Sequence, residues 1–112
     1  MRTHFNYVAY FPATSRIKIG ITSNPERRAR EYGQEAFRHG LGNISFCRGS
    51  SQFKGVARMV EQSIRDNLKN AALAPHHEWF QGDPEAFCAF IDMTTRLQRQ
   101  TRNLLGVEAV NA

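Results

Sequence analysis

Six residues of this chain have the types and the spacing that suit the cleavage of phosphodiester bonds. They comprise an early tyrosine, a lysine and a glycine set between isoleucines, an arginine and a tyrosine four positions apart, and a later glutamate: Tyr7, Lys18, Gly20, Arg28, Tyr32 and Glu61. Such cleavage needs an activated water, neutralisation of charge on the phosphoryl oxygens and help for the leaving oxygen. We therefore treat these six residues as the candidate site.

Two of the six residues suit a metal ion and a phosphate group. A single glutamate can hold one Mg²⁺ or Mn²⁺, and Mg²⁺ keeps most of its waters and binds substrate phosphate directly. This predicts Glu61 as the metal ligand. Arginine has a planar fork of donors that matches phosphate oxygens, so we expect Arg28 to hold the scissile phosphate.

The two tyrosines are candidates for proton transfer. A tyrosine with its ordinary pKa of about 10 is a poor base, but we expect a neighbouring cation such as Lys18 or Arg28 to lower that pKa. Tyr7 or Tyr32 would then relay the proton from the attacking water. Lys18 could instead hold phosphate, and Gly20 is expected to let the backbone come close to the substrate.

Ordinary structural explanations compete with these roles. Tyr7 could be a half-buried aromatic residue of a strand, and Arg28 and Tyr32 could form a surface stacking pair because they lie one helical turn apart. Glu61 has an arginine three residues before it and another four residues after it, so a helical ladder of salt bridges explains it without a metal. The order of all six residues along the chain, taken together, is what favours a site.

The first part of the chain predicts a hairpin followed by a short helix. Residues 5–11 are largely aromatic, and residues 17–22 alternate isoleucine with small or polar residues, which is typical of strands. The short turn between them predicts an antiparallel hairpin. The Asn-Pro-Glu sequence at 24–26 is a helix start, and Gly33 is expected to end that helix. Residues 34–42 are ambiguous.

The second part predicts a third strand at residues 44–48 and two helices. The helix over residues 52–70 has a stripe that we expect to be buried: Val56, Val60, Ile64 and Leu68, widened by Met59. The last helix begins at 83–85 and continues to about residue 105, with an apolar face formed by Phe87, Phe90, Ile91, Thr94 and Leu97. Trp79 and Phe80 are expected to fill the core, whereas His76 and His77 lack metal-ligand spacing and indicate a solvated loop. Together the elements predict one domain over residues 1–112, of the α/β (α+β) class, with a small, mainly antiparallel three-stranded sheet flanked by helices.

The chain is basic, with 15 Lys and Arg against 10 Asp and Glu, for a net charge of +5. This balance suggests a polyanionic partner, either nucleic acid or an anionic surface, although an uninvolved basic surface would look the same. The arginines proposed for nucleic-acid contact are Arg16, Arg27, Arg96 and Arg99. With Arg102, the last two form either a stripe that follows phosphates or a solvated helix face.

The two cysteines, Cys47 and Cys88, lie in apolar stretches and outside any CxxC pair. We therefore expect buried free thiols in a reducing cytoplasm. Polar residues interrupt the N-terminal segment, so no signal peptide is expected. No apolar run approaches the roughly 18 residues of a transmembrane helix, and we expect no membrane association.

Three stretches together resemble the GIY-YIG nuclease superfamily: YVAYF at 7–11, KIGIT at 18–22 and NPERR at 24–28. More narrowly they resemble its branch of small phage and meiotically up-regulated proteins, in which EWF follows, here at residues 78–80. The resemblance covers residues 7–80, about two thirds of the chain, and the helix after Asp83 lies beyond it. KIGIT followed by NPERR is the most specific part.

The resemblance implies a role for each candidate. Tyr7 matches the tyrosine of the first motif, Gly20 the glycine of the second, and Arg28 the helix arginine, with Arg27 as an alternative register. Tyr32 stands where the superfamily has histidine or tyrosine, and Glu61 matches the metal-binding glutamate. Lys18 replaces the usual tyrosine of the second motif, and a late asparagine of the superfamily has no counterpart here.

The function implied by the resemblance is a metal-dependent endonuclease that hydrolyses DNA with Mg²⁺ or Mn²⁺. Because no separate sequence-reading domain is evident, a homo-oligomer or a protein partner could supply specificity. Two alternatives stay open. One is a nucleic-acid-binding module of the same fold that has lost catalysis, which the lysine at position 18 favours. The other is an accessory protein, such as one from a phage, that binds and inhibits a host protein.

Overall fold

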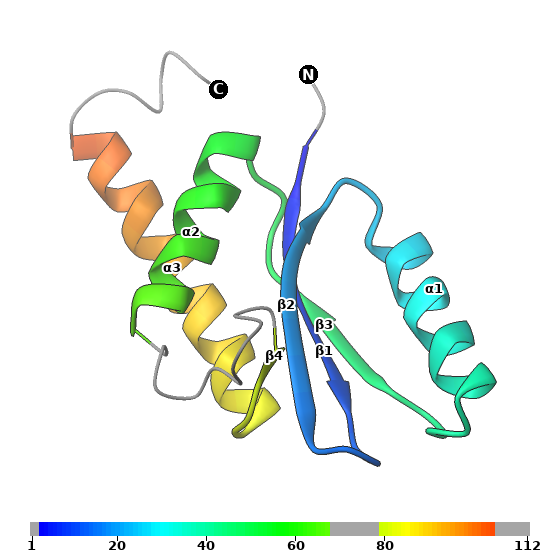
Figure 1. Ribbon diagram of the computed structural model, residues 1–112. Coiled ribbons are helices and arrows are strands. Elements are labelled where there is room, and N and C mark those ends of the chain that lie inside the picture. Colours follow the sequence, from blue (N-terminus) through cyan, green and yellow to red (C-terminus); the bar gives the residue numbers. More distant parts are fainter. Residues whose placement is uncertain (1–2, 68–78, 105–112) are drawn as a thin grey trace.

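A computed structural model describes residues 3–67 and 79–104 as a sheet between helices (Figure 1). In chain order the elements are β1 (Phe5–Phe11), β2 (Arg16–Thr22), α1 (Pro25–Arg38), β3 (Ser45–Arg48), α2 (Lys54–Asn67), β4 (Trp79–Phe80) and α3 (Pro84–Leu104). The predicted α+β class is confirmed. None of the helices in the described ranges is long and apolar enough to cross a membrane.

The strands form one antiparallel sheet in the order β3-β1-β2-β4. In the central hairpin Tyr7 lies opposite Gly20, and Ala9 lies opposite Lys18, so all four positions share one face of the sheet. On the outer edge of β2, Lys18 pairs with Trp79 of β4. The prediction of three strands missed β4, because a strand of two residues is too short to show an alternating pattern.

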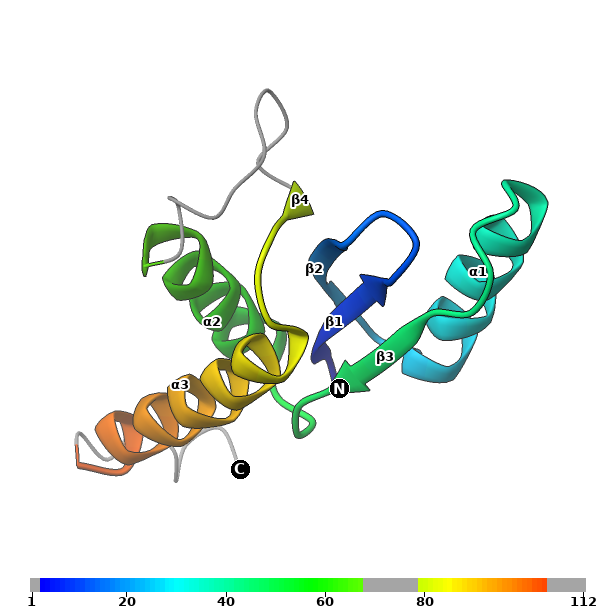
Figure 2. The same ribbon diagram turned by 90° about the horizontal axis from the view of Figure 1, so that it is seen from below.

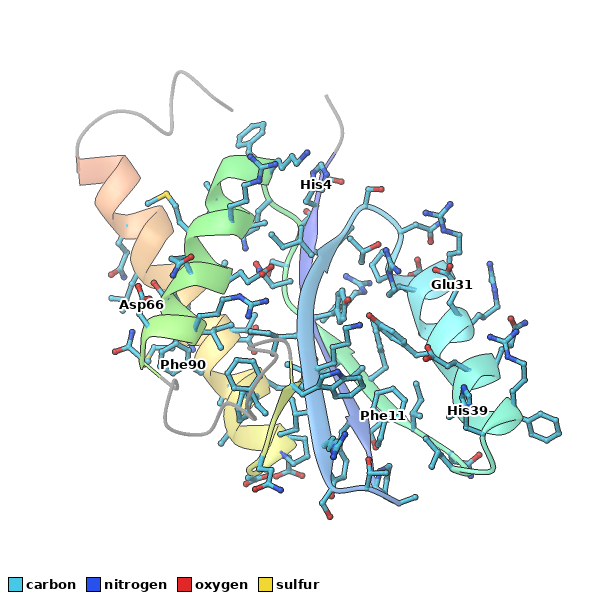
Figure 3. All side chains as sticks on the ribbon, in the orientation of Figure 1. His4, Phe11, Glu31, His39, Asp66 and Phe90 are labelled. Carbon is cyan, nitrogen blue, oxygen red and sulfur yellow. A yellow bond between two sulfur atoms is a disulfide. The ribbon has the colours of Figure 1, made fainter. Side chains whose placement is uncertain are left out.

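The sheet separates two hydrophobic clusters. Helix α1 covers one face, while α2 and α3 cover the other (Figures 1 and 2). The cluster under α1, here called the α1-side cluster, consists of Tyr7, Ala9, Phe11, Tyr32 and Ala36. Figure 3 shows Phe11 in this space between the sheet and α1. The larger cluster on the opposite face consists of Val8, Ile17, Ile19, Val56, Val60, Ile64, Phe80, Phe87 and Ile91.

Helix α1 begins as predicted and runs further than predicted. The Asn24 side chain accepts a hydrogen bond from the backbone N–H of Arg27, and Pro25 opens the helix. The prediction that Gly33 ends the helix is wrong. Tyr32 and Ala36 on either side of it are both buried, and their burial offsets the cost of about 1 kcal/mol for a glycine in a helix. The helix ends at Arg38, before Gly40 takes up a left-handed conformation with φ of 67°.

Helices α2 and α3 confirm most of the predicted apolar stripes. The buried members of the α2 stripe are Val56, Val60 and Ile64, while Leu68 lies outside the described residues. Met59 and Leu97 were wrongly predicted to be buried, since they are 48% and 54% exposed. Met59 lies beside the stripe where the helix surface turns to solvent, and Thr94 and Thr95 occupy the buried positions of α3 near Leu97. Asp83 caps α3 by accepting from the backbone N–H of Glu85.

A disulfide joins Cys47 in β3 to Cys88 in α3, across a sequence separation of 41 residues. The prediction of two free thiols is therefore wrong. The first turn of α3 packs beside β3 and brings the two sulfurs together, a proximity that sequence spacing cannot reveal. The prediction of a cytoplasmic location rested partly on free thiols and loses that support, because stable disulfides are typical of oxidising compartments.

Candidate active site

The hydroxyl groups of Tyr7 and Tyr32 meet at the centre of the candidate site. The two residues are 4% and 6% exposed, and their oxygens lie 2.7 Å apart in a hydrogen bond for which either can be the donor. The ring of Phe46 stacks against Tyr7 with centroids 5.3 Å apart. Tyr7 is thus a core residue of the α1-side cluster as well as a candidate for chemistry.

Gly20 makes room for Tyr7. A Cβ atom at Gly20 would lie 2.6 Å from Cζ and 2.8 Å from Cε2 of the Tyr7 ring, closer than real carbon contacts allow. The ring therefore lies directly across the Gly20 backbone on β2. The role predicted for Gly20 was close approach of the backbone to substrate, and the contact that the structure describes is with the tyrosine of the neighbouring strand.

Burial raises the pKa of Tyr7 above its ordinary value of 10.0, and the hydrogen bond to Tyr32 and the negative charge of Glu61 raise it further. Arg28 acts in the opposite direction. The expectation that a nearby cation would lower this pKa is therefore wrong in its net effect, because desolvation outweighs the attraction of one guanidinium. Tyr7 is a neutral hydroxyl at neutral pH.

The same interactions show which charged groups surround the tyrosine pair. Arg28 comes from α1 on the same face of the sheet, whereas Glu61 comes from α2 on the opposite face. Arg28 lowers the pKa of Tyr7 and Glu61 raises it, each less than burial does. Of the predicted site residues, Tyr7 and Tyr32 are therefore in direct contact, and Arg28 lies beside the Tyr32 ring.

Lys18 places its ammonium group between two aromatic rings. Nζ lies 5.3 Å from the centroid of Tyr32 and 5.4 Å from the centroid of Trp79, both within the range of cation–π attraction. Trp79 also packs against Phe11, with centroids 5.5 Å apart. Lys18 is therefore held beside the tyrosine pair as a fixed positive charge.

Trp79 packs against the α1-side cluster and also contacts Lys18 of the candidate site, whereas the sequence predicted only a core residue. It is only partly buried, while its neighbour Phe80 fills the core on the opposite face. Trp79 and Phe80 differ in burial because successive side chains of a strand point to opposite faces of the sheet. The available signal was the EWF sequence at 78–80 within the family resemblance.

Arg28 has a donor without a partner. Its guanidinium lies 5.9 Å from the centroid of the Tyr32 ring, and Nη1 lies 3.8 Å from Oε1 of Glu31. Its Nε is buried and makes no hydrogen bond within the described residues. A buried unsatisfied donor is costly, so this nitrogen is suited to an incoming acceptor such as a phosphate oxygen. Arg28 and Tyr32 therefore lie within cation–π range, but Tyr32 is buried and not part of a surface pair.

Glu61 is engaged in a helical salt bridge. Its Oε1 accepts hydrogen bonds from Nε and Nη2 of Arg65 at 3.1 Å and 2.9 Å. The structural explanation of Glu61 as part of a salt-bridge ladder is therefore confirmed toward Arg65. Both side chains are only partly buried, so the carboxylate remains accessible.

The donor set suits a weakly held hard cation. The described ranges contain no group of three or more His, Cys, Asp or Glu side chains that could hold a metal ion. A single carboxylate is nevertheless compatible with Mg²⁺, which retains several waters and is commonly bound through one or two carboxylates plus substrate phosphate. Glu61 is the residue that fits this role. His76 and His77 lie outside the described residues.

The arginines predicted to contact nucleic acid do not form one surface. Arg16, Arg27 and Arg96 are all exposed, but they lie on β2, α1 and α3. Helices α1 and α3 are on opposite faces of the sheet (Figure 2). The side chains of Arg99 and Arg102 lie outside the described residues.

Comparison with protein families matches residues 4–104 to the T5orf172 domain. The match includes α3, which lies beyond the resemblance seen at residues 7–80. Searches among curated proteins and among solved structures returned no match. The T5orf172 domain is phage-associated and stands in the context of GIY-YIG and HNH-like nucleases. Because the match covers most of the 112 residues, this chain belongs to the T5orf172 domain family.

Proposed function

We propose that this protein is a metal-dependent endonuclease that hydrolyses phosphodiester bonds in DNA, as a GIY-YIG-type enzyme with lysine in the second motif. The observation that carries the proposal is the tyrosine pair with two cations beside it: the Tyr7 hydroxyl bonds to Tyr32, and the Lys18 ammonium and the Arg28 guanidinium lie 5.3 Å and 5.9 Å from the centroid of the Tyr32 ring. The T5orf172 match is consistent with a nuclease or DNA-binding role.

Positive charge beside the tyrosine pair would hold the substrate. The Arg28 guanidinium can bind two phosphoryl oxygens through its planar fork, and its buried Nε has a donor to offer. Lys18, held between the rings of Tyr32 and Trp79, adds a point charge that would stabilise the negative charge developing on phosphorus-bound oxygens.

The tyrosine pair would act without forming a free phenolate. Because burial keeps Tyr7 protonated, its oxygen can accept a proton only as its own hydrogen moves to the Tyr32 oxygen 2.7 Å away. In such a relay the attacking water gives a proton to Tyr7, Tyr7 gives its hydrogen to Tyr32, and Tyr32 gives its own hydrogen to a solvent water, so each hydroxyl stays neutral. If Tyr32 is instead the donor of this hydrogen bond, Tyr7 is free to donate its own hydrogen to a phosphate oxygen.

Glu61 would hold the divalent cation. When bound, Mg²⁺ or Mn²⁺ lowers the pKa of water and neutralises charge on substrate oxygens. The Glu61 carboxylate already forms a salt bridge with Arg65. A metal ion would have to displace Arg65 or share the carboxylate with it, so we expect the metal to bind weakly in the absence of DNA.

A nucleic-acid-binding protein without catalysis is the second candidate function. The salt bridge from Glu61 to Arg65 favours it, because a glutamate fully occupied by arginine would not bind a metal. Lysine at position 18 also favours it. Binding through Lys and Arg would then persist after chelation of metals and after Glu61→Ala.

The test is cleavage of supercoiled plasmid with Mg²⁺ or Mn²⁺ by the wild type, Arg28→Ala and Glu61→Ala. We expect wild-type nicking that chelation abolishes and that each substitution reduces by at least about 100-fold. Arg65→Met is the matched control, because it removes the salt bridge but keeps the carboxylate. Retained nicking by Arg65→Met with loss in Glu61→Ala assigns Glu61 to the reaction. Equal nicking by all proteins, or DNA binding without any nicking, would refute the endonuclease proposal.

A further inference from the structure

The outward face of α1 carries a basic stripe with an exposed aromatic ring. Its members recur at intervals of three or four residues, so they lie together on one side of the helix. We call this the outer α1 surface, and it consists of Arg27, Arg30, Gln34, Phe37 and Arg38, all exposed. Phe37 is 83% exposed, which is unusually high for a large apolar side chain. The opposite side of α1 buries Tyr32 and Ala36 against the sheet.

A shallow hollow lies within this surface. It has a volume of about 500 Å³ and is lined by Arg30, Gly33, Gln34, Phe37 and Arg38. Gly33 is part of its lining, and a Cβ atom there would meet no other atom within 4 Å. Phe37 lies one helical turn further on, so its ring borders open space above the glycine. This space can receive a flat group beside the Phe37 ring.

We propose that the outer α1 surface binds nucleic acid that has unpaired bases, with one base stacked on Phe37 and the neighbouring phosphates near Arg30 and Arg38. Base stacking on aromatic side chains combined with backbone contacts from basic residues is how single strands are bound without sequence preference. A base within a duplex has both of its faces covered by its neighbours. That the partner is nucleic acid rests on the proposed function, and the outer α1 surface would be a second contact surface in addition to the candidate site.

Charge favours nucleic acid over an apolar partner at this surface. Phe37 is flanked by Arg30 and Arg38, whereas the central part of a protein interface is usually depleted of charge. Of the acidic residues of α1, Glu31 pairs with Arg28 at the edge of the helix toward the candidate site. Glu26 and Glu35 are exposed and stand four positions before Arg30 and three before Arg38, but the stripe keeps a positive balance with Arg27, Arg30 and Arg38.

Fluorescence anisotropy with a labelled 20-nucleotide oligothymidine and a duplex of the same length would test the proposal. The titrations use EDTA, so that binding is measured apart from cleavage. We expect Phe37→Ala and Phe37→Leu each to weaken single-strand binding roughly 10-fold and to change duplex binding much less, because leucine keeps the apolar surface but has no ring. We expect Arg30→Ala/Arg38→Ala to lower the slope of log affinity against log salt by about 1.4, as for two lost phosphate contacts.

Lys54→Ala/Arg58→Ala is the matched control, since it removes the same charge from exposed positions of α2. The proposal is overturned if Phe37→Leu binds like wild type, if single strand and duplex lose equal affinity, or if the control variant lowers the salt slope as much. Loss of binding in these variants while the wild type cleaves no DNA would support the surface and refute the endonuclease.

Discussion

The hydroxyl of Tyr7 in β1 lies 2.7 Å from the hydroxyl of Tyr32 in α1, so a buried hydrogen bond links the central strand to the helix that covers it. The bond is possible because Gly20 leaves space for the Tyr7 ring on the adjacent strand. Arg28 and Lys18 both lie near the Tyr32 ring. One tyrosine pair therefore connects the packing of α1 to the charges of the candidate site.

Replacing Gly20 should disturb this pair. Gly20→Ala would drive a methyl group into the Tyr7 ring, so we expect a loss of about 1–3 kcal/mol in the free energy of unfolding together with loss of DNA cleavage. Gly33→Ala is the control within the same protein, because it adds a methyl group in open space on a helix and should stabilise by about 0.5–1 kcal/mol. Urea denaturation measures both. Equal stability for the two variants would contradict the contact between Gly20 and Tyr7.

The pKa of Tyr7 predicts how stability depends on pH. The folded state raises this pKa above the ordinary value of 10.0, so the folded state holds the proton more tightly than the unfolded chain. The associated stability is fully present below about pH 10 and is lost as pH rises from there toward the folded pKa. In Tyr7→Phe, which has no hydroxyl to ionise, the free energy of unfolding should fall less steeply with rising pH. Denaturation midpoints of both proteins between pH 8 and pH 11 would test this prediction. The same dependence of the midpoint on pH in both proteins would contradict the burial of an ionisable hydroxyl.

Trp79 provides an intrinsic probe of the candidate site, because it is the only tryptophan of the chain and lies 5.4 Å from the Lys18 ammonium. If phosphate binds Lys18, adding a short oligonucleotide should change Trp79 fluorescence, and the change should weaken with salt. Lys18→Met should abolish the change, while Lys54→Ala on α2 should leave it intact. A fluorescence change that persists in Lys18→Met would place the bound phosphate elsewhere.

The disulfide between Cys47 and Cys88 should contribute to stability. It closes a loop across 41 residues, so reduction is expected to cost about 2–4 kcal/mol in the free energy of unfolding. Guanidinium denaturation with and without a reductant would measure the difference. Cys47→Ala/Cys88→Ala should match the reduced protein and should not respond to the reductant. A wild-type protein whose stability is unaffected by reduction would show that the cysteines are not bonded in solution.

The local parts of the fold were predictable from the sequence because their causes are local. The alternation of isoleucines in β2 marks a strand, and the hairpin follows from the short turn before it. Asn24 and Pro25 mark the start of α1 in the same way. The end of α1 was not predictable, because the burial of Ala36 against the sheet outweighs the preference of Gly33 for a helix end.

The contacts that the sequence could not reveal all join distant segments. Cys47 meets Cys88, and Trp79 meets Lys18, only because α3 and β4 pack where they do. The pKa of Tyr7 has the same origin, since the sequence shows the nearby cations but not the depth of burial. The sequence therefore predicted that Arg28 acts on the pKa of Tyr7, but not that burial raises this pKa overall.

The central claim is that Tyr7 and Glu61 act in one reaction, and the nicking rates of Tyr7→Phe, Glu61→Gln and the double variant under single-turnover conditions test it most directly. Tyr10→Phe serves as the control, because Tyr10 lies on the opposite face of β1. We predict that each single substitution lowers the rate by at least about 100-fold and that the double variant loses little more, as for residues that act as a unit. Wild-type rates in either single variant, or losses that multiply in the double variant, would contradict the claim.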